Sequence, residues 1–151
     1  MLKLATLTVA MTPLVAVPNG PYDETANPRA EIARMLQCAR DEGKPVLLMF
    51  GANWCEWCQA LDRKLMADKD LATLVDAVFL RLNIDIGSFD RNLDVAADHG
   101  LGNLDDTGVP MLVVLRHDGA VDAVKNSEDF VVGSRYANDR IRRFIRAYEK
   151  H

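Results

Sequence analysis

The sequence predicts one α/β domain, with a central mixed β-sheet, helices on both faces of the sheet, and a C-terminal β-hairpin followed by a helix. Helical and strand patterns alternate along residues 28–108, as they do in a parallel βαβ unit. Two β-rich runs then flank His117-Asp118-Gly119, which has the chemistry of a hairpin turn. The length of 151 residues is that of a single domain.

The N-terminal stretch over residues 1–18 has two interpretations. One early Lys followed by an apolar run from Leu4 to Val17 is typical of a signal peptide, which predicts a periplasmic protein. The alternative is a first β-strand, because Leu, Thr and Val favour strands, and the protein would then be cytoplasmic. Residues 19–27 are polar and rich in turn residues, so they predict a linker before a domain over 28–151.

The elements of the domain follow from local signals. Pro28 opens the first helical pattern and Gly43 ends it. "VLLMF" is a short apolar run between turn signals, which indicates a buried strand. The remaining predicted elements are a helix from residue 55, a strand over 77–85, a helix over 90–99, a loop over 100–108, the hairpin over 109–124 and a last helix over about 136–150.

Two cysteines carry the strongest chemical signal. Cys55 and Cys58 stand where a helix follows the buried strand, so Cys55 lies at a helix N-terminus. The free N–H groups and the dipole there favour a thiolate, the attacking species in disulfide exchange. Cys58 lies one turn later on the same face, where it can attack a mixed disulfide formed at Cys55. The spacing therefore predicts a redox pair with Cys55 as nucleophile.

Other uses of the same cysteines stay open at this point. Cys55 and Cys58 could hold a soft metal such as Cu(I) or Zn(II) for delivery. They could also be two small buried apolar residues whose spacing is coincidental. A noncatalytic adaptor is a further alternative. The third cysteine, Cys38, falls on the apolar side of the first helical pattern and is expected in the core, with a regulatory or intermolecular thiol as the alternative.

The quoted segments resemble the thioredoxin-like superfamily. "VLLMFGANWCEWCQALDRKL" carries a WCxxC motif, and "TGVPMLVVLRHDG" carries a Val-Pro before a hairpin. "PYDETANP", "FGANWC" and "FDRNLD" are similar to small bacterial members that are often exported. The resemblance implies a thiol–disulfide oxidoreductase without a bound cofactor. It would act on substrate proteins with disulfides and be recycled by a reductase, such as one in the membrane.

The resemblance also implies roles for residues around the cysteines. Pro110 would be cis and face the dithiol, and Val109 would offer its backbone to an extended substrate segment. Trp54 would pack beside the site. Trp57 is expected to be exposed, either as a docking residue for substrates or with its ring against a neighbouring loop. We expect substrate contacts at Trp54, Glu56, Trp57, Val109 and Pro110.

The sequence departs from thioredoxin at two places. The spacer is Glu56-Trp57 rather than Gly-Pro, and Glu56 opposes a thiolate at Cys55 by like charge. Thioredoxin carries a buried Asp six residues before its first cysteine, whereas this position is Met49. Because a helix terminus supplies only about 0.3–1 kcal/mol, we expect a mildly activated dithiol of the reducing type. Glu56 is a hypothetical proton carrier for Cys58.

Composition excludes several other functions. The net charge of -4 carries no nucleic-acid signature, so no nucleic-acid partner is expected. Three cysteines cannot form a four-cysteine zinc site. Asp90, Asp94 and Asp98 recur at helical spacing, which indicates a solvated face or, as the sharper hypothesis, a divalent-ion site.

Overall fold

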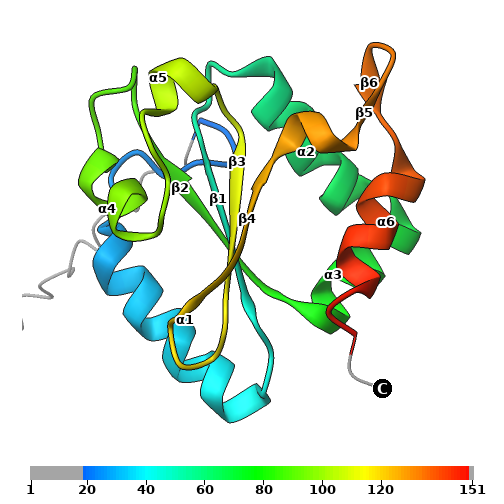
Figure 1. Cartoon of the computed structure of the whole chain (residues 1–151), viewed down its shortest axis with the longest axis horizontal. Helices are drawn as coiled ribbons and strands as arrows, with labels where there is room; N and C mark the ends of the chain where they lie inside the picture. Colours follow the sequence, from blue (N-terminus) through cyan, green and yellow to red (C-terminus); the bar gives the residue numbers. More distant parts are fainter. Residues whose placement is uncertain (1–18, 150–151) are drawn as a thin grey trace, which may run out of the picture.

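The computed structural model describes residues 19–149, and the predicted signal peptide or first strand over 1–18 lies outside the described residues. A four-stranded sheet runs through the middle of the molecule, with helices on either side (Figure 1). The strand order is β2-β1-β3-β4. The predicted fold class, a mixed sheet covered by helices on both faces, is confirmed.

The central strand is β1 (Val46–Gly51), whose six residues are all buried. It pairs in parallel with β2 (Leu80–Asp85) on one side and antiparallel with β3 (Met111–Leu115) on the other. β3 forms the predicted hairpin with β4 (Val121–Asn126). Apolar runs such as "VLLMF" make strands here because both faces of the sheet are covered.

The helices divide into two layers, which Figure 1 shows to the left and right of the sheet. One apolar cluster joins the sheet to α1 (Pro28–Glu42), α4 (Leu93–Asp98) and α5 (Leu104–Thr107). The other joins it to α2 (Glu56–Ala67), α3 (Lys69–Val78) and α6 (Asn138–Arg146). Alternate residues of β1 enter opposite clusters, since successive side chains of a strand point to opposite faces.

A short segment connects β4 to α6. It contains the 3-10 helix η1 (Ser127–Phe130) and the two-residue strands β5 (Val131–Val132) and β6 (Arg135–Tyr136), which pair antiparallel. No helix among residues 19–149 is long and apolar enough to cross a membrane.

Four elements differ from those predicted. Ala77 and Val78 belong to the separate helix α3, so the strand predicted over 77–85 begins at Leu80. The break before α3 arises at Asp68, which leaves helical geometry and accepts the N–H of Leu71 with its side chain. The predicted loop over 100–108 contains the single-turn helix α5, and the predicted helices over 90–99 and 136–150 are shorter, as α4 and α6.

The expectation that Cys38 lies in the core is wrong, because its side chain is exposed. α1 turns Ile32 and Ala39 toward the sheet. Adjacent residues of a helix differ by about 100° in direction, so Cys38 faces away from the contact that Ala39 makes. Cys38 is therefore an accessible thiol outside the site.

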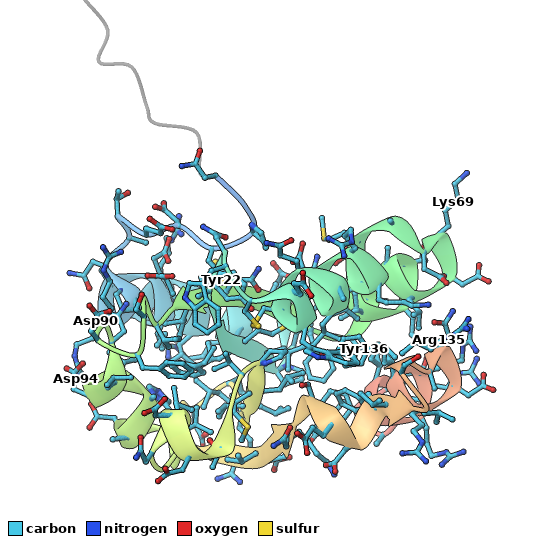
Figure 2. The ribbon with its side chains drawn as sticks, turned by 90° about the horizontal axis from the view of Figure 1, so that it is seen from above. Tyr22, Lys69, Asp90, Asp94, Arg135 and Tyr136 are labelled. Carbon is cyan, nitrogen blue, oxygen red and sulfur yellow. A yellow bond between two sulfur atoms is a disulfide. The ribbon has the colours of Figure 1, made fainter. Side chains whose placement is uncertain are left out.

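The acidic residues after β2 do not share one helical face. Asp90 precedes α4 and accepts the backbone N–H of Ser88. Asp94 and Asp98 each lie 2.7 Å from a guanidinium nitrogen of Arg29, at the surface of the molecule. Figure 2 shows Asp90 and Asp94 at the edge of the protein. Because Arg29 already pairs with Asp94 and Asp98, the structure does not support the divalent-ion hypothesis.

Candidate functional site: a CxxC disulfide at the start of a helix

Cys55 and Cys58 form a disulfide across the first turn of α2. Cys55 is the N-cap residue of this helix, in an extended conformation, and its Sγ accepts the backbone N–H of Cys58 at 3.1 Å. The strand–turn–helix arrangement predicted for the cysteines is thus present. The free N–H groups of the first turn surround Cys55, which favours negative charge on its sulfur.

The two cysteines differ in exposure. Cys55 is 6% exposed, whereas Cys58 is 1% exposed and packs against Tyr22. An incoming thiolate or disulfide can therefore reach Cys55 more readily than Cys58. This asymmetry suits a pair in which the first cysteine exchanges with a partner and the second acts within the protein.

β3 brings Val109 and Pro110 to the dithiol. Antiparallel pairing puts Met111 opposite Phe50, so the start of β3 meets the end of β1 and the loop that follows it. The Val109–Pro110 peptide bond is cis. The carbonyl oxygen of Val109 lies 3.7 Å from the Sγ of Cys55. Val109 thus borders the disulfide, and Pro110 follows it through the cis bond.

A hollow of about 400 Å³ opens beside the site. Its lining includes Trp57, Val109 and Glu128. The ring of Trp57 is 43% exposed, and its other side makes an edge contact with Tyr136 at 5.2 Å between ring centroids. Trp57 is thus exposed as predicted, and its ring packs against Tyr136 of β6 rather than against a loop.

Trp54 and Glu56 lie at the rim of the site. Trp54 is 54% exposed; its ring lies 5.6 Å from that of Phe89, and its Nε1–H donates to the carbonyl of Gly87 at 2.7 Å. Glu56 is exposed in the first turn of α2. Of the five residues predicted to contact substrate, Trp57 and Val109 line the hollow. Trp54 and Glu56 are the chain neighbours of Cys55, and Pro110 follows Val109.

Tyr22 is a site residue that the sequence interpretation missed. It lies in the segment predicted to be a linker, yet it is 1% exposed and packs against Cys55 and Cys58. Figure 2 shows it in the interior of the molecule, whereas Lys69 and Arg135 point outward. One feature of the sequence could have indicated its burial: Tyr22 is an aromatic residue inside an otherwise polar, turn-rich stretch.

Two carboxylates lie near the buried end of the site. Asp85, at the end of β2, is 3% exposed; it accepts the N–H of Gly87 at 3.1 Å and lies 3.3 Å from Arg91. Asp62, one turn after Cys58, accepts from the side chain of Asn83. Burial, followed by the charge of Asp62, raises the pKa of Tyr22 far above its ordinary value. The phenol therefore stays protonated wherever the fold is intact.

The comparisons agree with this geometry. The sequence profile of a family described as thioredoxin-like matches residues 27–117. The chain belongs to the thioredoxin-like family. A solved structure described as a disulphide isomerase from Xylella fastidiosa Temecula1 is 32% identical, with a TM-score of 0.75, over 87% of this chain and 98% of that one.

Two further similarities involve proteins named DsbD. A Pseudomonas aeruginosa protein, thiol:disulfide interchange protein DsbD 2, is 38% identical over 61 residues, which are 40% of this chain but only 10% of that protein. The C-terminal domain of Neisseria meningitidis DsbD in its oxidised form is 23% identical, with a TM-score of 0.57, over 82% of this chain and 97% of that one. This last likeness concerns the fold.

A thioredoxin-like chain with a CxxC disulfide at the N-terminus of a helix is a thiol–disulfide oxidoreductase. Within residues 19–149, no group of three or more His, Cys, Asp or Glu side chains is placed to hold a metal ion. Met49 is buried in the apolar cluster beneath α2, so this thioredoxin-like protein has no carboxylate at the position where thioredoxin carries its Asp.

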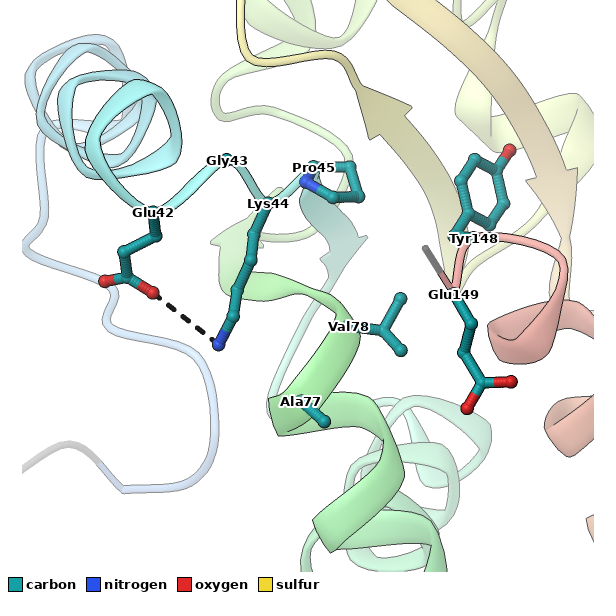
Figure 3. A pocket seen from close by; sticks show the side chains of 8 residues that line it. All are labelled: Glu42, Gly43, Lys44, Pro45, Ala77, Val78, Tyr148 and Glu149. Carbon is teal, nitrogen blue, oxygen red and sulfur yellow. Dashed lines mark ion pairs between the residues drawn. The ribbon is translucent and has the colours of Figure 1, made fainter. Parts of the chain in front are cut away.

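Another hollow, of about 510 Å³, lies at the opposite end of β1 from the dithiol (Figure 3). Its lining includes Lys44, which pairs with Glu42 at 3.5 Å and donates to the carbonyl of Asp76. Tyr148 and Glu149 border its other side. This thioredoxin-like chain thus has a second hollow far from its redox chemistry, and the lysine within it is already partnered.

The buried phenol predicts how stability changes at alkaline pH. The folded state holds the pKa of Tyr22 above the ordinary value of 10.0, so above that value the unfolded state loses the proton first. The free energy of unfolding should therefore fall as pH rises, by up to about 1.4 kcal/mol per pH unit from this phenol. Tyr136 and Tyr148, whose pKa values burial also raises, should add to the slope.

Urea unfolding between about pH 9 and about pH 11 measures this slope in a Cys38→Ser background, which prevents thiol exchange. Tyr22→Phe removes one titrating group and should make the slope shallower. An unchanged slope would contradict the assignment of Tyr22 as a phenol that must stay neutral in the folded state.

Proposed function

We propose that the protein is a reductase-type oxidoreductase that opens disulfides in other proteins. The observation that carries this proposal is the asymmetry of the two cysteines beside an open hollow. Val109 lines the hollow and its carbonyl oxygen lies next to the Sγ of Cys55, whereas Cys58 is almost fully buried. Cys55 attacks a substrate disulfide and forms a mixed disulfide. Cys58 then attacks the Sγ of Cys55, which releases the reduced substrate and leaves the enzyme oxidised.

Substrate is held beside the dithiol in an extended conformation. The backbone of Val109 continues directly into β3, and an extended segment can add to such a backbone by main-chain hydrogen bonds. The exposed face of Trp57 offers an aromatic contact next to the reacting sulfur. Trp54, Glu56 and Pro110 complete the contact surface. The proposed substrates are therefore proteins whose disulfides lie in exposed, extended segments.

The dithiol is of the reducing type because little around Cys55, the attacking sulfur, stabilises its thiolate strongly. The residues between the cysteines are Glu56 and Trp57, so no His or Lys stands there. The N-terminus of α2 typically supplies about 0.3–1 kcal/mol, and Glu56 opposes it. A weakly stabilised thiolate makes the dithiol a poor oxidant, because a strong oxidant has an unusually stable reduced form.

The reduction potential of the Cys55–Cys58 pair tests whether the protein acts as a reductant. We expect a value near or below about -230 mV, in the range of thioredoxin and glutaredoxins. The measurement is an equilibration with glutathione or dithiothreitol buffers, in a Cys38→Ser background because Cys38 is an exposed thiol. A value above about -180 mV would identify an oxidant or isomerase and would contradict the reductase proposal.

The partner that recycles the oxidised pair is proposed to be a membrane reductase. The support is the likeness to proteins named DsbD, one of which is described as a thiol:disulfide interchange protein. With the signal-like pattern over residues 1–18, this favours a periplasmic protein. Comparing the N-terminal residue of protein from a periplasmic extract with Met1 tests the export and cleavage of that segment.

A further inference from the structure

The segment before α1 is fixed onto the site by side-chain amides. Asn53, two residues before Cys55, accepts the backbone N–H of Tyr22 at 3.0 Å and donates to the carbonyl of Tyr22 at 2.9 Å. Asn83 of β2 donates to the carbonyl of Pro21 at 2.9 Å. These bonds hold both backbone groups of Tyr22, so its ring enters the interior beside the dithiol in a defined position.

The hydroxyl of Tyr22 and the sulfur of Cys58 converge on one point at the end of β1. A Cβ atom on Gly51 would lie 2.5 Å from the Oη of Tyr22 and 2.7 Å from the Sγ of Cys58. The separation of the two atoms cannot exceed the sum of these distances. Both atoms therefore border the space that a side chain at Gly51 would fill.

The other titratable groups that face this pair are acidic or neutral. Asp62 faces Tyr22 from α2, Asp85 from the end of β2, and Tyr136 from β6. Arg91 lies on the far side of Asp85, with which it pairs. Both carboxylates oppose a thiolate at Cys58 by like charge. Because burial and these charges keep the phenol protonated, Tyr22 can only donate a proton in a hydrogen bond to a sulfur anion.

We propose that the hydroxyl of Tyr22 donates a hydrogen bond to the Sγ of Cys58 when the disulfide opens and so stabilises the Cys58 thiolate. The inference rests on the proposed function in one respect, the role of Cys58 as resolving thiol. In thioredoxin a buried Asp lies near the second cysteine, whereas Met49 takes that position here. The inference gives the polar role beside Cys58 to the phenol of Tyr22 instead.

The step balances without a proton transfer. A thiolate of the recycling partner attacks the Sγ of Cys55, the Cys55–Cys58 bond breaks, and a new bond joins the partner to Cys55. Cys58 leaves with the electron pair as a thiolate, and Tyr22 keeps its proton while it donates the hydrogen bond. In the opposite direction the Cys58 thiolate attacks the mixed disulfide at Cys55. A buried sulfur anion needs such a donor because water does not reach it.

The experiment measures the pKa of Cys58 directly. In a Cys38→Ser, Cys55→Ser background, the Cβ chemical shift of isotope-labelled cysteine is followed against pH. Tyr22→Phe should raise the pKa of Cys58 by about one unit, which is about a tenfold loss of thiolate at neutral pH. Phe preserves the ring packing, and near-ultraviolet circular dichroism checks that the fold is kept. Tyr148→Phe, the same change at a site packed on Phe79, is the matched control and should leave this pKa unchanged.

A Cys58 pKa that is equal in the Tyr22→Phe and Tyr148→Phe variants would overturn the inference. This titration needs no substrate, so it decides the inference even if the protein with both cysteines fails to reduce disulfides. Such a failure would refute the proposed function instead. In the active protein, Tyr22→Phe should also slow the opening of the disulfide by dithiothreitol, because a thiol of higher pKa leaves more slowly.

Discussion

Replacing Cys55 with Ser is expected to abolish disulfide exchange, with a rate at least about a thousandfold lower than that of the unaltered protein. Cys55 is the more accessible sulfur and the cap of α2, so it is the atom that meets the substrate. A serine hydroxyl is not ionised at neutral pH and cannot attack a disulfide. Reduction of insulin by dithiothreitol, followed as turbidity, measures the loss.

Cys58→Ser should behave differently, because Cys55 can still attack while nothing resolves the product. This variant should accumulate mixed disulfides with substrate proteins, visible as bands that disappear on reduction. Cys38→Ser is the matched control, since it removes an exposed thiol outside the site and should keep full activity. Accumulation in the Cys55→Ser variant instead would mean that the roles of the two cysteines are reversed.

The parts of the site that depend on local sequence could be predicted. A strand, a short turn and a helix cap lie within a dozen residues, so "VLLMFGANWC" largely determines where Cys55 stands. The hairpin after Pro110 is equally local, because Asp118 and Gly119 form its turn. Bringing these two segments together needed only the expectation that β1 and β3 share a sheet.

Features that depend on distant partners could not be predicted in the same way. Tyr22 enters the interior because Asn53 and Asn83 hold its segment, and amides that bond across more than 30 residues leave no periodic pattern. Cys38 was misplaced because Ala39, its neighbour, is the residue that α1 turns toward the sheet. A one-residue error in the direction of a helical face moves a thiol from the core to the surface.

Gly51 is the residue whose replacement should affect both the fold and the site. Its backbone conformation suits any amino acid, so its importance lies in space alone. A Cβ there would lie 2.5 Å from the Oη of Tyr22, 2.7 Å from its Cζ and 2.7 Å from the Sγ of Cys58. Neither a clamped aromatic ring nor a sulfur held in a disulfide can move aside easily. Packing at the end of β1 therefore requires glycine.

Gly51→Ala should lower the free energy of unfolding by about 1–3 kcal/mol, the usual cost of overfilling a packed interior. Urea unfolding of the oxidised protein measures the change. Gly102→Ala is the matched control: no atom outside its chain neighbours lies within 4 Å of a Cβ there, so its effect should stay within about 0.5 kcal/mol. Equal effects of the two substitutions would contradict the steric argument.

Combining Gly51→Ala with Tyr22→Phe separates the clash with the Tyr22 hydroxyl from the clash with the Cys58 sulfur. Phe lacks the hydroxyl, the nearest of the three atoms to the new methyl group, so the double variant should be more stable than the sum of the two single changes predicts. Additive effects would mean that the hydroxyl does not stand above Gly51. Because the inferred hydrogen bond to Cys58 requires the hydroxyl at that point, this thermodynamic cycle tests the same geometry without any redox chemistry.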